Sequence, residues 1–210
     1  PLSDHRRLRL RMARDMLLDA LLRRDLGVPA VIKRYRRLRE RLGEEEVQGF
    51  EPQLVALTAM AAGRSEAQVR AIVAEWIENR PLPHLAACRY LGVAELFAGL
   101  RRHGKIIGVV SDYPAPAKLN ALGLVADFVV SATDADVGLL KPHPRGLEFL
   151  MQRAAISPAD TLLIGDRVER DGLAARRAGT RCLIRSSRRR PGWQSFARFD
   201  EPLFTPMISA

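Results

Sequence analysis

Apolar residues in the first 80 positions recur every three or four residues, which places them on one face of an α-helix. Four segments show this pattern: Leu10, Ala13, Leu17 and Leu21; Ile32, Tyr35, Leu38 and Leu42; the stretch from Pro52 to Gly63; and Val69, Ile72, Val73, Trp76 and Ile77. Gly27 and Pro29 separate the first two, and Ser65 with Gln68 forms a capping box before the fourth. The pattern predicts an all-helical unit over residues 1–80, with no strand.

After the Pro81-Leu82-Pro83 sequence, short apolar runs alternate with amphipathic segments. The predicted strands are 105–110, 128–131, 161–164 and 181–184, and the predicted helices are 93–102, 115–122, 144–155 and 171–178. Strands that alternate with helices are typical of right-handed βαβ units around a buried parallel sheet. We therefore predict an α/β protein whose Rossmann-like parallel sheet core, with a C-terminal tail, occupies residues 81–210. Trp193 and Phe196 are expected to dock that tail.

Polar residues stand where the predicted strands end. Ser111 follows the first strand, and Gly165-Asp166 follows the third, with Asp171 five positions later. Ligands of α/β proteins bind at the carboxyl ends of parallel strands, and two carboxylates beside a phosphate pocket are typical ligands of Mg²⁺. Lys141 lies between these segments and can supply positive charge to a phosphate.

In this order the motifs resemble those of the haloacid dehalogenase superfamily of hydrolases, most of whose members are phosphatases. The matching segments are Ile106-Ile107-Gly108-Val109-Val110-Ser111, Gly138-Leu139-Leu140-Lys141-Pro142-His143-Pro144, and Gly165-Asp166 with Asp171. His143 stands where aspartate is commoner in the family, and we interpret it as a packing or capping residue. The resemblance implies that the helical unit is a cap over the sheet.

The resemblance also implies roles for individual residues. Ser111 would bind a phosphate oxygen, and Lys141 would bind substrate and stabilise the transferring phosphoryl group. Asp166 would be a direct Mg²⁺ ligand, and Asp171 would ligate through water or orient the shell around the ion. Glu169 is an additional acid with a weaker claim. The expected substrate is a small phosphorylated molecule, hydrolysed with the help of Mg²⁺.

One element of the family pattern has no counterpart in this sequence. Family members begin with a central strand ending in Asp-x-Asp; the first aspartate forms an aspartyl-phosphate, and the second is general acid and base. Asp4 follows no apolar strand, and Asp15 and Asp19 are interpreted as solvated helix residues. Three explanations stay open: residues upstream of Pro1 are missing, the chain is a degenerate member, or another residue replaces the nucleophile. We expect this chain to be catalytically incompetent.

The net charge of +10 comes almost entirely from arginine, because lysine occurs only at positions 33, 105, 118 and 141. Arginine clusters at residues 6–41 and 185–190 leave an alternative function as a non-catalytic anion-binding protein, although a nucleic-acid partner is not favoured. No apolar run reaches membrane-spanning length, charged residues interrupt 8–22 as a signal peptide, and only two cysteines occur, so we expect a cytoplasmic protein. Neither the substrate nor the oligomeric state can be read from the sequence.

Overall fold

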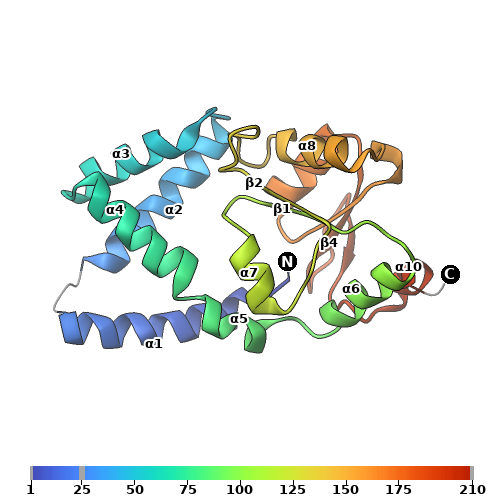
Figure 1. The fold of residues 1–210 in the computed structure, drawn as a ribbon, viewed down its shortest axis with the longest axis horizontal. Helices are drawn as coiled ribbons and strands as arrows, with labels where there is room; N and C mark the ends of the chain where they lie inside the picture. The colour runs from blue at the N-terminus through green and yellow to red at the C-terminus, as the bar shows by residue number, and fades with distance from the viewer. Residues whose placement is uncertain (1, 24–26, 209–210) are drawn as a thin grey trace.

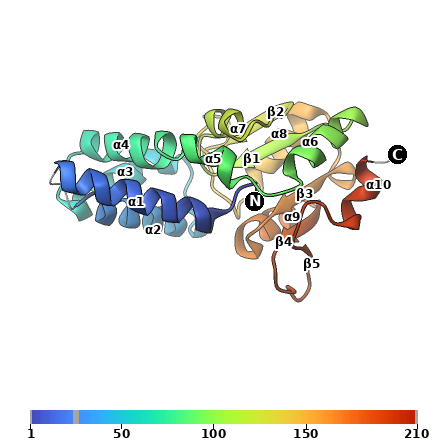
Figure 2. The same ribbon diagram turned by 90° about the horizontal axis from the view of Figure 1, so that it is seen from below.

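The computed structural model describes residues 2–23 and 27–208. Its first part is helical: α1 (His5–Arg23), α2 (Val28–Glu44), α3 (Phe50–Ala62), α4 (Glu66–Val73) and the π-helix η1 (Ala74–Asn79). Figures 1 and 2 show these helices gathered on one side of the molecule, with the strands on the other. We call α1 to η1 the helical unit and the elements from α5 onward the sheet unit. A domain division at residue 80 stays a prediction.

The local signals in the helical unit are confirmed. Pro29 lies in the first turn of α2, where its missing N–H costs nothing, and Gly63 ends α3 in the left-handed region. The Ser65–Gln68 capping box forms as predicted: the Ser65 hydroxyl accepts from the Gln68 N–H, and the Gln68 amide oxygen accepts from the Ser65 N–H. Apolar residues of α2, α3, α4 and η1, among them Trp76, share one buried core.

The apolar face predicted for α1 is wrong. Leu10 and Leu17 are 69% and 64% exposed, whereas Met12 and Met16 pack against the helical core. The apolar residues of α1 lie on several of its faces, so their spacing alone does not determine which face is buried. The side chain of Leu21, the last member of the predicted stripe, lies outside the described residues.

Asp15 and Asp19 are not solvated either, and their interpretation as exposed helix residues is corrected. The Asp15 carboxylate lies 2.6 Å from Nε2 of His84, and the Arg80 guanidinium donates to Asp19 at 2.9 Å. Both aspartates thus join α1 to the segment around α5 (Leu82–Cys88). Their partners lie more than 60 residues away, so no local pattern marks the pairs.

The sheet unit contains five parallel strands: β1 (Gly108–Ser111), β2 (Phe128–Ser131), β3 (Leu162–Gly165), β4 (Arg181–Arg185) and β5 (Gln194–Phe196). The other elements are α6 (Val93–Arg102), α7 (Pro116–Leu122), α8 (Arg145–Ala154), η2 (Pro158–Asp160), η3 (Val168–Gly172), α9 (Leu173–Arg177), η4 (Pro202–Phe204) and α10 (Thr205–Ile208). The four predicted strands are present within a few residues, and the α/β fold class with its parallel sheet is confirmed. Strand β5 and helix α5 were not predicted.

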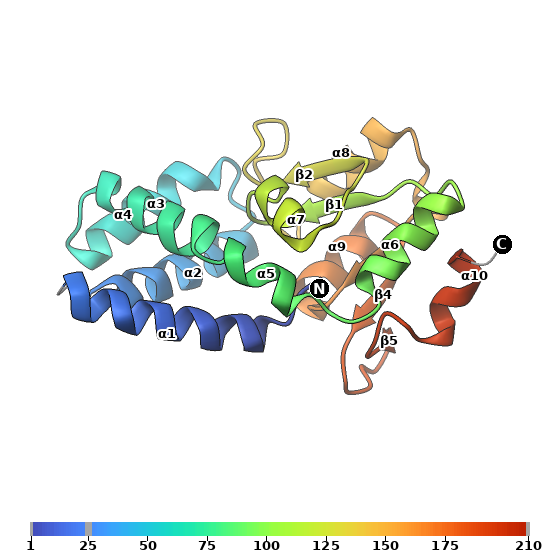
Figure 3. The same ribbon diagram turned by 60° about the horizontal axis from the view of Figure 1, so that its bottom comes forward.

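Alternate strand residues face opposite layers, as the period of two requires. Val109 packs into a cluster with residues of α6 and α7, and the next residue, Val110, packs against α8. Figure 3 shows α6 and α7 on the near side of β1 and β2, with α8 behind them. Phe196 of β5 belongs to the first cluster, where its ring meets Phe199 and Phe204 edge-on at 5.0 and 4.9 Å between centroids. The strands therefore form the middle layer between helices.

The parallel strands form two separate sheets. Among the described residues, β1 pairs only with β2, whereas β3 pairs with β4, which pairs with β5. The two pieces share a core on each face: α8 residues contact both Val110 of β1 and Leu163 of β3, and Val109 and Ile164 belong to one cluster on the other face. No described strand lies between β1 and β3, where the family resemblance places the strand of the first motif.

Candidate functional site

The carboxyl end of β1 presents Ser111 at the edge between the two sheets. Its backbone carbonyl accepts from the Ala132 N–H at 2.8 Å, which fixes it against the end of β2. Its hydroxyl oxygen accepts from the Tyr113 N–H at 3.2 Å, so the chain turns sharply after the strand. The hydroxyl proton remains available to donate to an anionic oxygen.

Lys141 connects the two sheets at this edge. Its ammonium group donates to the Val110 carbonyl of β1 at 3.4 Å and to Oδ1 of Asp171 at 2.8 Å, and its backbone N–H donates to Asp112 at 3.2 Å. Burial alone would lower the pKa of Lys141, but the carboxylates of Asp112 and Asp171 raise it above its ordinary value. Lys141 is therefore a fixed positive charge, as a phosphate-stabilising role requires.

Asp171 organises the loop that follows β3. Its Oδ2 atom accepts from the N–H groups of Asp166 and Arg167, both at 3.1 Å, while Oδ1 accepts from Lys141. Burial would raise the pKa of Asp171, but Lys141 and these N–H groups hold it below its ordinary value. A Cβ atom at Gly165 would lie only 2.7 Å from Oδ2, so glycine is required for this close approach.

Asp166 is the carboxylate of this loop best placed to reach a cation. Its side chain is 25% exposed and its Oδ2 atom lies 3.7 Å from Nε2 of His5, in the first turn of α1. Glu169 is further out: its side chain is 64% exposed and accepts from Arg167 at 3.0 Å. Glu169 is thus an ion-pair partner of its own loop.

These residues can hold a Mg²⁺ ion through one direct protein ligand, with water and phosphate oxygens completing the shell. Among residues 2–23 and 27–208, no three His, Cys, Asp or Glu side chains form a cluster able to hold a metal. Both oxygens of Asp171 are engaged, which suits a residue that orients the shell, whereas Asp166 fits a direct ligand. Mg²⁺ commonly takes one or two protein carboxylates and completes its shell with water and phosphate oxygens. These residues fit that pattern.

A second network, which no sequence pattern indicates, ties α2 to this loop. Arg167 donates to both carboxylate oxygens of Glu40 at 2.8 Å, and Arg170 donates to the Glu40 carboxylate and backbone carbonyl, both at 2.7 Å. Arg170, 4% exposed, also donates to the Lys141 carbonyl. Hydrogen bonds from Arg167 and the charge of Arg170 lower the pKa of Glu40. Arg170, 130 positions from Glu40, thus joins the helical unit to Lys141.

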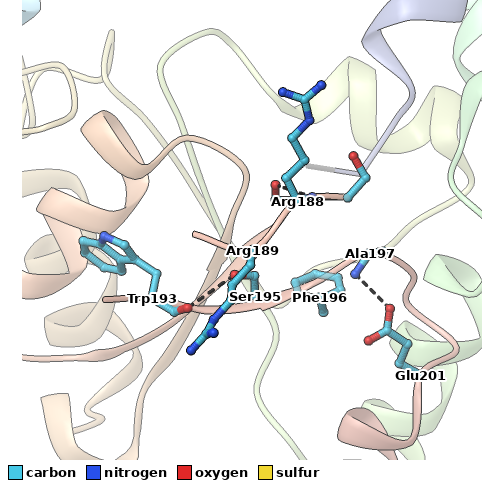
Figure 4. A pocket seen from close by; sticks show the side chains of 9 residues that line it. Arg188, Arg189, Trp193, Ser195, Phe196, Ala197 and Glu201 are labelled. Atoms are coloured by element: carbon cyan, nitrogen blue, oxygen red, sulfur yellow. Dashed lines mark hydrogen bonds between the residues drawn. The ribbon is translucent and has the colours of Figure 1, made fainter. Parts of the chain in front are cut away.

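The remaining sequence candidates lie elsewhere. His143 accepts the Arg145 N–H through Nδ1 at 3.1 Å, in agreement with its interpretation as a capping residue. A cavity of about 410 Å³ lies at the 185–190 arginine cluster, and Figure 4 shows Arg188, Arg189 and Trp193 around it. None of Ser111, Lys141, Asp166 or Asp171 lines that cavity.

The fold is a parallel α/β fold whose motif residues meet at the edge between its two sheets. The model of the haloacid dehalogenase-like hydrolase family matches residues 11–179, and the chain belongs to this family. Phosphoglycolate phosphatase 1 of Pseudomonas aeruginosa is 32% identical over 124 residues, which are 57% of this chain and 45% of that protein. Phosphoglycolate phosphatase of Escherichia coli K12 is 34% identical over 90 residues, which are 41% of this chain and 35% of that protein. The match thus spans less than half the length of these relatives.

Solved structures support the fold. The HAD hydrolase YfnB of Bacillus subtilis, whose crystal structure is described as bound to magnesium, superposes with a TM-score of 0.70. That match covers 98% of this chain and 93% of YfnB at 16% identity. A 2-haloacid dehalogenase from Pseudomonas syringae gives a TM-score of 0.60 at 18% identity, covering 94% of this chain and 90% of that one. At these identities the likeness concerns the fold alone.

Among the described residues, no helix is long and apolar enough to cross a membrane.

Proposed function

We propose that this chain carries the phosphate- and metal-binding edge of a phosphomonoester hydrolase that acts on a small phosphorylated substrate. The observation that carries the proposal is the position of Lys141. Its ammonium nitrogen contacts both the end of β1 and Asp171, so that motif residues from three distant segments meet at one edge. The names of the relatives, both phosphoglycolate phosphatases, support the substrate class.

Each residue has a defined part in this proposal. The Ser111 hydroxyl donates to a phosphate oxygen, and the Lys141 ammonium neutralises charge on the phosphoryl group during its transfer. Asp171 holds the Asp166 backbone and Lys141 in position. Bound through Asp166, Mg²⁺ would supply further positive charge to the phosphate oxygens.

The proposal includes very low turnover for residues 1–210 alone. A nucleophile must lie between β1 and β3 to reach a phosphorus atom held by Ser111 and Lys141, and no described strand passes there. The described carboxylates nearest Lys141 are already committed, since Asp112 accepts its N–H and Asp171 its ammonium. The alternative is a non-catalytic protein that retains the phosphate site.

The first experiment is an assay of p-nitrophenyl phosphate hydrolysis with Mg²⁺, with Asp166→Ala as the comparison. We expect both proteins to show only background turnover. Hydrolysis above background that disappears in Asp166→Ala would overturn the proposed incompetence while supporting the site.

The binding site itself is tested by calorimetry with inorganic phosphate, with and without Mg²⁺. We expect phosphate to bind, Mg²⁺ to increase its affinity, and Asp166→Ala to remove that increase. Glu169→Ala is the matched control, because this exposed acid of the same loop should leave the Mg²⁺ effect intact. Absence of phosphate binding in the folded wild type would reject the proposed function.

The proposal also covers the role of the helical unit, the cellular compartment and the nucleic-acid partner. The helical unit would act as a cap, with the division near residue 80. The two cysteines, Cys88 and Cys182, are both free, which suits a reducing compartment such as the cytoplasm. Nucleic acid is not proposed as a partner.

A further inference from the structure

Arg39 of α2 is buried without a full set of hydrogen-bond partners. The residue is 4% exposed, and its Nε and Nη2 atoms have no acceptor among the described residues. Within residues 2–23 and 27–208 its guanidinium makes one hydrogen bond, a long one from Nη1 to the Tyr35 hydroxyl at 3.4 Å. Buried donors are normally satisfied, and an unpaired charged donor is costly, so this guanidinium needs an explanation.

Aromatic rings hold the Arg39 guanidinium in place. Its central carbon lies 4.1 Å from the centroid of Tyr113 and 4.8 Å from that of Phe50. Phe50 belongs to the helical unit, whereas Tyr113 follows Ser111 by two residues, and its N–H donates to the Ser111 hydroxyl oxygen. Arg39 therefore lies where the helical unit meets the sheet unit, and Tyr113 links it to Ser111, the proposed phosphate-binding residue.

A second cation lies against the same ring. The Lys118 ammonium is 5.0 Å from the Tyr113 centroid, and no carboxylate of the described residues forms an ion pair with it. Burial lowers the pKa of Lys118 to about 8; Glu78 opposes this shift, and Arg39 and Arg36 add to it. Two nearby carboxylates are already committed: Glu40 binds Arg167 and Arg170, and Asp112 accepts from Lys141. Two cations thus lie against the Tyr113 ring, and the charge of Glu78 opposes the lowering of the Lys118 pKa only in part.

We propose that Arg39, with Lys118, binds a second anionic group of the substrate, so that the preferred substrate carries a carboxylate or a second phosphate besides the phosphate held at Ser111 and Lys141. The inference rests on the proposed function and deepens it. A carboxylate or phosphate oxygen pairs with the planar N–H fork of an arginine. Stacking between rings orients that fork in advance, so less freedom is lost when an anion binds. At 4% exposure the Arg39 guanidinium can meet a ligand only if a side chain packed on it, such as that of Tyr113, moves aside.

The experiment measures the binding of three probes that cannot be hydrolysed, by calorimetry with residues 1–210 and Mg²⁺. Methylphosphonate carries one anionic group, phosphonoacetate adds a carboxylate, and ethylenediphosphonate adds a second phosphonate. We expect at least one of the two longer probes to bind about tenfold or more tightly than methylphosphonate. Which of them gains more identifies the second group as carboxylate or phosphate.

Variants assign this preference to Arg39. Arg39→Met keeps an unbranched apolar stem between the rings, and it is expected to reduce the tenfold preference to below about threefold. Arg37→Met is the matched control: it removes the same charge from an exposed position of the same helix and should leave the preference unchanged. Thermal unfolding checks that each variant is folded. If Arg39→Met does not fold, Lys118→Met takes its place and is expected to lower the preference at least threefold.

Each outcome decides the inference. Equal affinities for the three probes, or a preference that survives in folded Arg39→Met, would overturn it while methylphosphonate binding still upholds the phosphate site. A preference lost equally in Arg37→Met would show attraction by net charge alone and would also overturn it. If no probe binds, including methylphosphonate, the proposed function fails and the second anion site fails with it.

Discussion

At the scale of single residues, the site consists of charges whose neighbours fix their protonation. Lys141 remains charged because two aspartates surround it, whereas Lys118 is half-buried with other cations nearby. The surroundings of Lys141 stabilise its charged form in the folded protein. The surroundings of Lys118 destabilise its charged form. A residue that lowers stability where no folding role requires it is commonly retained for function.

The cost of Lys118 can be measured through its dependence on pH. A fall in its pKa from 10.5 to about 8 corresponds to at most about 3.5 kcal/mol, at about 1.4 kcal/mol per pKa unit. We therefore expect Lys118→Met to raise the free energy of unfolding at pH 7 by about 1–3 kcal/mol. The measurement is urea denaturation of both proteins from pH 7 to pH 10.

The sign of the pH effect follows from proton binding. Between the folded pKa of about 8 and the unfolded value of 10.5, unfolded Lys118 holds a proton that the folded protein releases. The wild type therefore gains stability relative to Lys118→Met as the pH rises through this range, and the advantage of the variant shrinks. An advantage that stays constant from pH 7 to pH 10 would contradict the assigned cause.

At the scale of elements, α2 is the helix that connects the helical unit to the site. Glu40 receives hydrogen bonds from Arg167 and Arg170, and Arg170 reaches the Lys141 carbonyl. Gly43, one turn further along α2, leaves room for this arginine, because a Cβ atom there would collide with its guanidinium. Arg170, from the loop after β3, therefore packs closely against α2 and is hydrogen-bonded to it.

Removal of the Glu40 charge tests this connection. Glu40→Gln keeps the shape of the side chain but leaves the buried Arg170 guanidinium without its carboxylate, so we expect a loss of about 1–2 kcal/mol in the free energy of unfolding. Urea denaturation at pH 7 measures it. The control is Glu44→Gln, since the Glu44 side chain is 72% exposed and lies 3.7 Å from Arg170. Exposed pairs contribute little, so the control should change by less than about 0.5 kcal/mol. Equal losses in the two variants would argue against the connection.

At the scale of the whole molecule, the break between β1 and β3 is the dominant feature. Helices cover both faces of the two sheets and share their cores, yet the facing strand edges pair with nothing described. Unpaired strand edges expose N–H and C=O groups that favour pairing with another strand. The gap lies beside Lys141, the residue of the proposed site that contacts both β1 and Asp171.

Hydrogen exchange tests the break in the sheet. Strand β4 pairs on both sides, whereas β1 and β3 each pair on one, so we expect the slowest amide exchange in β4 and faster exchange at alternate amides of β1 and β3. Amide exchange followed by NMR at pH 7 gives the comparison. Equal protection of β1, β3 and β4 would mean that something covers the two edges and would contradict the split sheet.

The sequence alone determined most elements and the family, because these depend on residues that are close along the chain. Periodicity located the helices and strands, the Ser65–Gln68 box fixed a helix start, and Ser111, Lys141 and Asp166 are recognisable from their short motifs. The tertiary structure decided which face of α1 is buried, that Asp15 pairs with His84, and that Glu40 joins Arg170. It also placed Arg39 against Tyr113. These contacts join residues separated by about 60 to 130 positions, and the free energy that selects them comes from burial and charge in three dimensions, which leave no periodic pattern in the chain.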